Sequence, residues 1–408
     1  MKTTLLRATR GDFIATGVIA AVSALAIGGV WLTADIRGVE HSPASNAYEN
    51  SEVLTKLDGN LSEQFRLNTA KIPGIHRPQV AGNLLITPTS DGVIATNDAG
   101  EQVWSYHRSD APLCSLGTAW DKVVLTFKTG VGCGDVVSLH ANSGKYADTR
   151  SANSSEEVVA IGSNDRVGTV SNDRVELWRS DLVRTVEYGN VEAKQEAEHQ
   201  PHEDCTINSA LTRTELLAVV ETCPDESNKS WLRLQKVTPE DSRKPEMEKD
   251  IALDSSGARL IAVSQDAAAV FIPEGSPRIE SYNKSGAQLA SVRVKPSPTV
   301  SESTSPFAPA TADLPHHMTW FDGARLYLLN PATLKVEHIF EDAIGTGIAI
   351  DDHLVIPTKE GLREVDWSTG KSKKNFKVDR GDYSGPVSIQ RFGQAIAEKR
   401  GDETVVLR

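Results

Sequence analysis

Two different hydrophobic patterns divide this chain of 408 residues. Residues 13–33 form one uncharged apolar run, FIATGVIAAVSALAIGGVWLT. From about residue 62 to the end, apolar runs of roughly five residues, rich in Val, Ile and Leu, alternate with Gly, Asn, Asp, Ser or Pro, as in NLLITP, VVLTF, LLAVVE, RLYLL and ETVVLR. The second pattern predicts an all-β repeat fold. No long helical period follows residue 33, which argues against a parallel βαβ fold.

The apolar run at 13–33 is long enough to cross a bilayer core of about 30 Å as a helix. Lys2, Arg7 and Arg10 precede it, which predicts that residues 1–12 stay in the cytoplasm and that the rest is translocated. We therefore predict a single-pass signal anchor in the plasma membrane, a polar stalk at 34–61 and an extracytoplasmic domain at 62–408. The alternative is a cleaved signal peptide, although Leu32-Thr33-Ala34 is a poor cleavage site and the run is longer than usual.

The cysteines agree with an extracytoplasmic domain. There are four, in two close pairs, and each pair flanks an apolar run that is typical of a strand. In an oxidising compartment these pairs predict two disulfides, Cys114–Cys133 and Cys205–Cys223. The alternative is a metal site, because His199, His202 and Cys205 have the spacing H-x-x-H-x-x-C. The polar, loop-like surroundings of these residues favour the disulfide.

A turn motif recurs along the chain. Each copy has an apolar strand, a polar turn with Asn, Asp or Ser and usually Gly, and a second strand; the copies begin at Thr96, Leu139, Tyr282, Leu329 and Val365. The glycine suits a turn position with positive φ, and the fourth copy has Leu334 in its place. The copies are separated by approximate multiples of roughly 40–47 residues, about the length of one four-stranded propeller blade.

The closest copies, Asp98 to Trp104 and Asp366 to Lys371, resemble the D-x-x-T-G-K/E-x-x-W turn of PQQ-like (quinoprotein-type) β-propeller repeats. With its N-terminal anchor, the chain is similar to membrane-anchored PQQ-like propeller proteins of actinobacterial envelopes. The resemblance implies seven or eight blades, and we favour eight. The first seven start near residues 80, 113, 156, 204, 257, 315 and 345, and the last uses residues 387–408, closed by a strand near 63–67. Residues 295–314, rich in Pro, Ser and Thr, predict a flexible insertion between blades.

The sequence argues against catalysis. Quinoprotein dehydrogenases, which the resemblance brings in, need adjacent cysteines in a disulfide and oxygen ligands for Ca²⁺, but no two cysteines are adjacent here. No nucleophile elbow, H-E-x-x-H helix or P-loop occurs. We assign no catalytic, cofactor-binding or metal residue. Net charge of −12 also argues against nucleic acid as a partner.

Histidine and tryptophan side chains are the remaining candidates for a site. His316 and His317 could line the central funnel or bind a metal, but a solvated loop is the simpler interpretation. Six tryptophans recur about once per blade and predict packing between blades; a stacking pocket would need two of them in the funnel: Trp104, Trp120, Trp178, Trp231, Trp320 and Trp367.

These observations favour a non-catalytic propeller of the cell envelope that acts as a protein-interaction scaffold or binding module, with no cofactor and with an unidentified protein partner. A sensor or binding protein for a small ligand in the funnel is the first alternative. A divergent quinoprotein-type oxidoreductase is the second. A broad apolar patch would favour the scaffold, and a Ca²⁺-ready oxygen cluster on the axis would favour the oxidoreductase.

Overall fold

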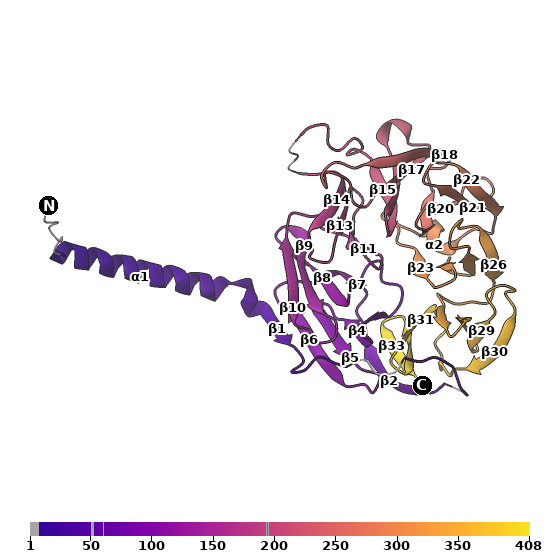
Figure 1. Ribbon diagram of the computed structural model, residues 1–408, viewed down its shortest axis with the longest axis horizontal. Helices are drawn as coiled ribbons and strands as arrows, with labels where there is room; N and C mark the ends of the chain where they lie inside the picture. Colours follow the sequence, from indigo (N-terminus) through magenta and orange to yellow (C-terminus); the bar gives the residue numbers. More distant parts are fainter. Residues whose placement is uncertain (1–7, 50–52, 60, 193, 195) are drawn as a thin grey trace.

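The computed structural model describes residues 8–49, 53–59, 61–192, 194 and 196–408. Helix α1 (Arg10–Thr33) extends away from a disc of β-sheets (Figure 1). The side chain of Thr9 accepts a hydrogen bond from the backbone N–H of Asp12, and Asp12 in turn accepts one from Thr9, a capping box that fixes the start of the helix. No residue of α1 is buried by protein, so its apolar surface lacks a partner within the described chain. By length and composition the helix can cross a membrane.

In the described residues the strands form eight sheets, and each is an antiparallel propeller blade in a closed ring (Figure 1). Blade 1 contains β3 (Gln79–Ala81), β4 (Leu84–Pro88), β5 (Gly92–Thr96) and β6 (Gln102–Arg108). Blade 2 contains β7 (Leu113–Ala119), β8 (Lys122–Thr129), β9 (Gly132–His140) and β10 (Tyr146–Ser151). Blade 3 contains β11 (Val159–Gly162), β12 (Val167–Val170), β13 (Arg174–Trp178) and β14 (Arg184–Gly189). Blade 4 contains β15 (Thr206–Arg213), β16 (Leu216–Thr222), β17 (Ser230–Lys236) and β18 (Met247–Leu253), with a short 3-10 helix η2 (Pro224–Glu226).

The second half of the ring follows the same plan. Blade 5 contains β19 (Arg259–Val263), β20 (Ala267–Ile272), β21 (Arg278–Asn283) and β22 (Gln288–Arg293). Blade 6 contains β23 (Ala310–Asp313), β24 (Met318–Phe321), β25 (Leu326–Leu329) and β26 (Val336–Phe340). Blade 7 contains β27 (Ile348–Ile350), β28 (His353–Thr358), β29 (Gly361–Val365) and β30 (Ser372–Lys377). Eight blades and the all-β class are as the sequence predicts.

Blade 8 joins the two ends of the propeller. It contains β31 (Val387–Phe392), β32 (Ala395–Arg400) and β33 (Glu403–Leu407), and its outer strand is β2 (Glu63–Asn68) from the start of the domain. Phe65 and Leu67 of β2 pack on the apolar side chains of this blade. The closure leaves no gap in the ring between the first and last blades, as the sequence predicts.

The segment predicted as a stalk, residues 34–61, packs against the propeller through much of its length. After a 3-10 turn, η1 (Asp35–Gly38), β1 (Val39–Ser42) adds a fifth strand to blade 1 by pairing with β6. The backbone N–H groups of Ala44, Tyr48 and Leu54 then donate to blades 2 and 8, and Leu57 is buried. The few apolar residues of a polar segment are therefore enough to hold it against the disc.

The expectation of a flexible insertion at residues 295–314 is wrong. Ser297 caps a short helix, α2 (Pro298–Ser301), and Val300 and Phe307 are buried. The backbone N–H of Phe307 donates to the carbonyl of Asn208 in blade 4 at 2.7 Å. Composition suggested mobility, but these two apolar side chains and local hydrogen bonds order the segment.

Candidate functional site

A cavity of about 700 Å³ lies on the axis of the propeller. It is lined by the innermost strands of blades 1–6 and 8, and by the turns that follow several of them. Because the lining comes from seven blades, closure of the ring creates this cavity, and no single repeat contains it. Its volume lies within the range of about 300–1,000 Å³ that is usual for small-molecule sites.

Two loops close one end of the cavity. The loop before blade 1 crosses the axis, because Gly74 approaches Ala160 of blade 3 and Ala308 of the loop before blade 6. An added Cβ at Gly74 would lie 3.2 Å from the Ala160 nitrogen, so only glycine fits here without displacement. The His76 ring is hydrogen-bonded through Nε2 to the carbonyl oxygen of Ala308 at 2.7 Å. We call these two loops, residues 72–77 and 305–309, the floor of the cavity.

The opposite end is its mouth. Asn83, Trp120, Asp121 and Asn164 line it from the turns that follow the innermost strands of blades 1–3. Val53, from the segment that links the helix to β2, also contributes to the lining. The cavity is therefore a pocket with a floor and a mouth.

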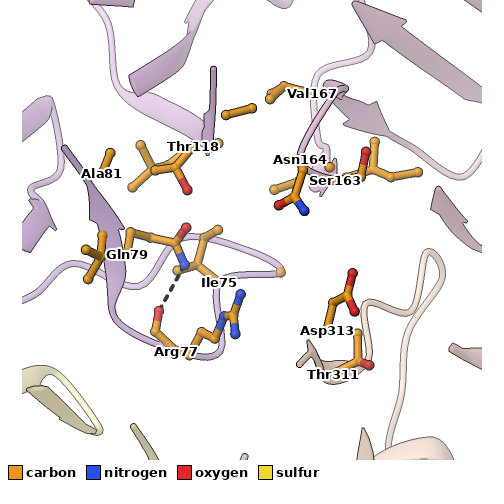
Figure 2. Close-up of a pocket in the computed structure, with 18 of the residues that line it drawn as sticks. Ile75, Arg77, Gln79, Ala81, Thr118, Ser163, Asn164, Val167, Thr311 and Asp313 are labelled. Atoms are coloured by element: carbon orange, nitrogen blue, oxygen red, sulfur yellow. Dashed lines mark hydrogen bonds between the residues drawn. The ribbon is translucent and has the colours of Figure 1, made fainter. Parts of the chain in front are cut away.

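Polar side chains point into this pocket (Figure 2). Arg77 projects from the floor, and Asp313 stands across from it on the end of β23. Asp313 already has a partner, because its Oδ2 lies 2.9 Å from Nε of Arg213. Within the described chain, the guanidinium of Arg77 has no hydrogen-bond or ion-pair partner. The Gln79 amide donates to the backbone carbonyl of Arg77 at 3.1 Å.

Burial shapes the electrostatics of the pocket. Burial inside the pocket lowers the pKa of Arg77, while the charge of Asp313 opposes this shift. Burial raises the pKa of Asp313, while Arg213 and Arg77 favour its charged form. An arginine stays protonated in proteins, so Arg77 retains its charge. The pocket thus holds the guanidinium of Arg77 in addition to the Arg213–Asp313 ion pair, and these three groups together carry a net positive charge.

Two further side chains leave hydrogen-bonding capacity unused. Thr118 of β7 and Asn164 of the turn after β11 both point into the cavity (Figure 2). In the part of the chain that the structure describes, neither side chain makes a hydrogen bond. By contrast, the Thr311 hydroxyl donates to the Thr319 carbonyl and the Ser163 hydroxyl donates to Asp165.

The two cysteine pairs form disulfides, Cys114–Cys133 and Cys205–Cys223, with Cα–Cα distances of 6.1 and 4.2 Å. Neither lines the pocket. His202, Cys205 and Glu221 do cluster within 4.8 Å. The alternative of a metal site is nevertheless wrong for Cys205, because its sulfur is in a disulfide. Glu221 is also engaged, accepting hydrogen bonds from Tyr188 and Arg233.

His316 and His317 do not line the pocket. His317 stacks on Trp367 of blade 7, with ring centroids 5.3 Å apart, and pairs with Glu337 at 2.6 Å. His316 pairs with Asp352 at 3.1 Å. Both histidines therefore connect blades 6 and 7.

The tryptophans mainly pack, as the sequence predicts. Trp104, Trp178, Trp320 and Trp367 are buried. Trp231 donates from Nε1 to Glu226 at 2.8 Å, away from the axis. Trp120 is the exception, since it lines the mouth of the cavity. One tryptophan does not make the stacking pocket for which two would be needed.

Arg77, Thr118 and Asn164 were not found from the sequence. They belong to three different blades or connecting loops and match no motif. The available signal was weak: Arg77 is a charged residue in a short loop, GIHRP, next to a predicted first strand. Only the closed ring shows that these residues share one cavity.

Comparisons with known proteins add little to this geometry. No protein-family model matches the chain, and no curated protein sequence matches it. Among solved structures, one of PorZ, described as an essential bacterial surface component of the type-IX secretion system of human oral-microbiomic Porphyromonas gingivalis, is similar with a TM-score of 0.43 and 10% identity. The match covers 84% of this chain but 46% of that one, so this chain spans less than half of its length.

Proposed function

We propose that this protein is a non-catalytic binding module of the cell envelope, anchored in the plasma membrane by α1, and that the axial pocket is its binding site. The observation that carries the proposal is the pocket itself, which has a floor, a mouth and unpaired polar groups directed inward. Such a pocket is the usual form of a small-molecule site.

The side chains in the pocket favour binding over catalysis. Its lining contains no histidine, cysteine or glutamate among the described residues. Of its two aspartates, Asp313 is paired with Arg213 and Asp121 is exposed at the mouth. General acid–base, nucleophilic or metal chemistry needs other sets of groups. The oxidoreductase alternative loses support in the same way, since neither disulfide lines the pocket and the lining has no cluster of carboxylates.

The helix and the disulfides support the proposed location. Exposed apolar residues cover α1, among them Phe13, Leu25 and Trp31. Burying them in lipid would remove their contact with water. Positive residues before the helix support a cytoplasmic N-terminus, and two disulfides support an oxidising compartment for the propeller. Only residues 34–38 separate α1 from β1, so the propeller would lie close to the membrane surface.

Cross-linking in native membranes tests the binding site. The full-length protein is purified from cross-linked membranes beside Thr118→Trp, which fills the pocket, and Val183→Trp, which adds the same bulk at an exposed position. We expect the wild type and Val183→Trp to retain the same bound molecules and Thr118→Trp to lose them. Equal recovery with all three proteins would contradict a role for the pocket in binding.

A protein-interaction scaffold is the second candidate function. It is favoured by the way β1 and the following segment attach the anchor to blades 1, 2 and 8, because this holds the disc at the membrane. Among the described residues, exposed large apolar side chains outside α1 are few and are scattered over four blades and the segment after the helix, which does not favour a broad apolar docking patch: Ile36, Val53, Val131, Tyr146, Val183, Leu289 and Ile339. A stoichiometric protein partner retained by Thr118→Trp would favour this candidate.

A further inference from the structure

We propose that the floor of the pocket binds the carboxylate or phosphate group of a small polar molecule, with Arg77 as the residue that contacts the anionic group. This inference rests on the proposed function, since it names the class of ligand for the same pocket. It is carried by the guanidinium of Arg77, which has no partner among the described residues and projects into the axial cavity (Figure 2).

The local charges leave room for one anion. Arg213 and Asp313 are paired at 2.9 Å, so their charges largely compensate each other. Arg77 has only the more distant influence of Asp313. Arg77 is half-buried in the cavity, and a partly desolvated charge without a counter-ion is less stable than a paired one. A ligand anion would supply that counter-ion. The chain as a whole carries −12, so any preference for anions must come from this local arrangement.

The geometry of the polar groups in the pocket further limits the class of ligand. A guanidinium offers a planar fork of donors, which matches two oxygens of a carboxylate or phosphate. The Thr118 hydroxyl and the Asn164 amide lie on other sides of the same cavity and have free capacity for hydrogen bonds. They would suit hydroxyl or carbonyl groups on the body of the ligand. A cavity of about 700 Å³ has room for both parts.

Two other ligand classes fit less well. A divalent cation prefers several oxygen ligands, and here it would meet one paired carboxylate beside two guanidinium groups. A purely apolar ligand would leave Arg77, Thr118 and Asn164 desolvated without partners, at a cost for each.

Binding of simple probes to the full-length protein in detergent tests the proposal. The probes are glucose 6-phosphate, glucuronate and neutral glucose, and the measurement is the Kd by calorimetry. Arg77→Gln removes the charge, and Arg77→Lys keeps the charge but loses the fork. Arg66→Gln is the matched control, because Arg66 lies exposed on β2, where it pairs with Glu63. Thermal unfolding shows whether each variant is folded.

We expect at least one anionic probe to bind the wild type and Arg66→Gln more tightly than glucose does. Arg77→Gln should weaken the binding of that probe by about 10- to 100-fold, as expected for a lost charged hydrogen bond, and Arg77→Lys should weaken it less. Tight binding of glucose 6-phosphate alone identifies a phosphate, and of glucuronate alone a carboxylate; binding of both supports the shared chemistry.

Three results would overturn the inference: no binding of either anionic probe, equal affinity for glucose, or unchanged affinity in a folded Arg77→Gln. The cross-linking experiment separates this failure from a failure of the proposed function. If Thr118→Trp loses a bound molecule that Arg77→Gln keeps, the pocket is a binding site but the proposal that Arg77 binds an anionic group is wrong. Equal recovery of bound molecules with Thr118→Trp and the wild type would contradict both the binding role of the pocket and the anionic ligand.

Discussion

The backbone conformation of individual residues explains the recurring turn motif. Gly100, Gly144, Gly286 and Gly370 have φ between +64° and +88°, where residues with a Cβ are strained. The first polar residue of a turn also holds its shape. Asn97 Oδ1, for example, accepts from the backbone N–H of Ala99 and Glu101 at 3.1 and 2.9 Å. The repeated Asn or Asp and Gly are therefore consequences of local geometry.

Leu334 occupies the glycine position of its turn, with φ of +55°, and its side chain is fully buried. Both Leu334→Gly and Leu334→Ala lose this buried side chain, at about 2–5 kcal/mol. Glycine relieves the strained backbone, so we expect Leu334→Gly to be less destabilised than Leu334→Ala by about 1 kcal/mol. Denaturant unfolding measures the difference.

The control for this prediction is the same pair of substitutions at Leu328. It is equally buried, but it lies in strand β25. There glycine should be worse than alanine by about 0.5–1 kcal/mol. The same order at both positions would show that strain at residue 334 has no measurable effect.

Between secondary-structure elements, a side chain from the preceding blade packs against each of these turn glycines. Trp104 of β6 in blade 1 lies against Gly144 in blade 2, and its Nε1–H donates to the Ala141 carbonyl at 2.7 Å. Phe65, Lys249 and His338 lie against Gly100, Gly286 and Gly370 in the same way. The outer strand of one blade thus docks on the turn of the next, which links the motif to the assembly of the ring.

We expect Gly144→Ala to destabilise the propeller by about 2–4 kcal/mol, from backbone strain and from displacement of Trp104. A Cβ at this position would lie 2.7 Å from the indole. Gly130→Ala is the control, because a Cβ there meets nothing within 4 Å. Thermal or denaturant unfolding measures both. Equal stability of the two variants would refute the docking role of this turn.

At the scale of the whole molecule, ring closure decides both stability and the site. β2 lies in sequence far from β33, yet the two strands pair and complete blade 8. Asp98 at the turn of blade 1 also accepts hydrogen bonds from Gln394 and Arg408 of blade 8. These contacts hold the first and last blades together, and with them the lining of the axial pocket.

Phe65→Ala should therefore weaken the propeller as a whole. Phe65 is partly buried on the core of blade 8, so we expect a loss of about 2 kcal/mol, a lower melting temperature and proteolysis in several blades. Leu289→Ala is the control. Leu289 is 40% exposed and lies on the outer strand β22, which takes no part in ring closure. Cleavage confined to residues 62–68, with an unchanged melting temperature, would contradict this role of β2.

Features of this protein that depend on local pattern could be predicted from its amino-acid sequence. The apolar run of α1, the short strands, the turn glycines and the pairing of nearby cysteines all follow from periodicity, spacing or conformational preference. Each involves residues near one another in the chain, or a repeat that one blade already specifies.

Features that depend on contacts between distant segments became visible in the folded protein. The packing of residues 39–49 and 53–57 on the disc depends on a few buried side chains such as Leu57, and the ordering of residues 295–314 depends on others such as Phe307. The polar composition of both segments gave no sign of these contacts. Arg77, Thr118 and Asn164 line one cavity because eight blades close into a ring. Such a site has no contiguous sequence motif, because its residues come together only after the first and last strands of the propeller have paired.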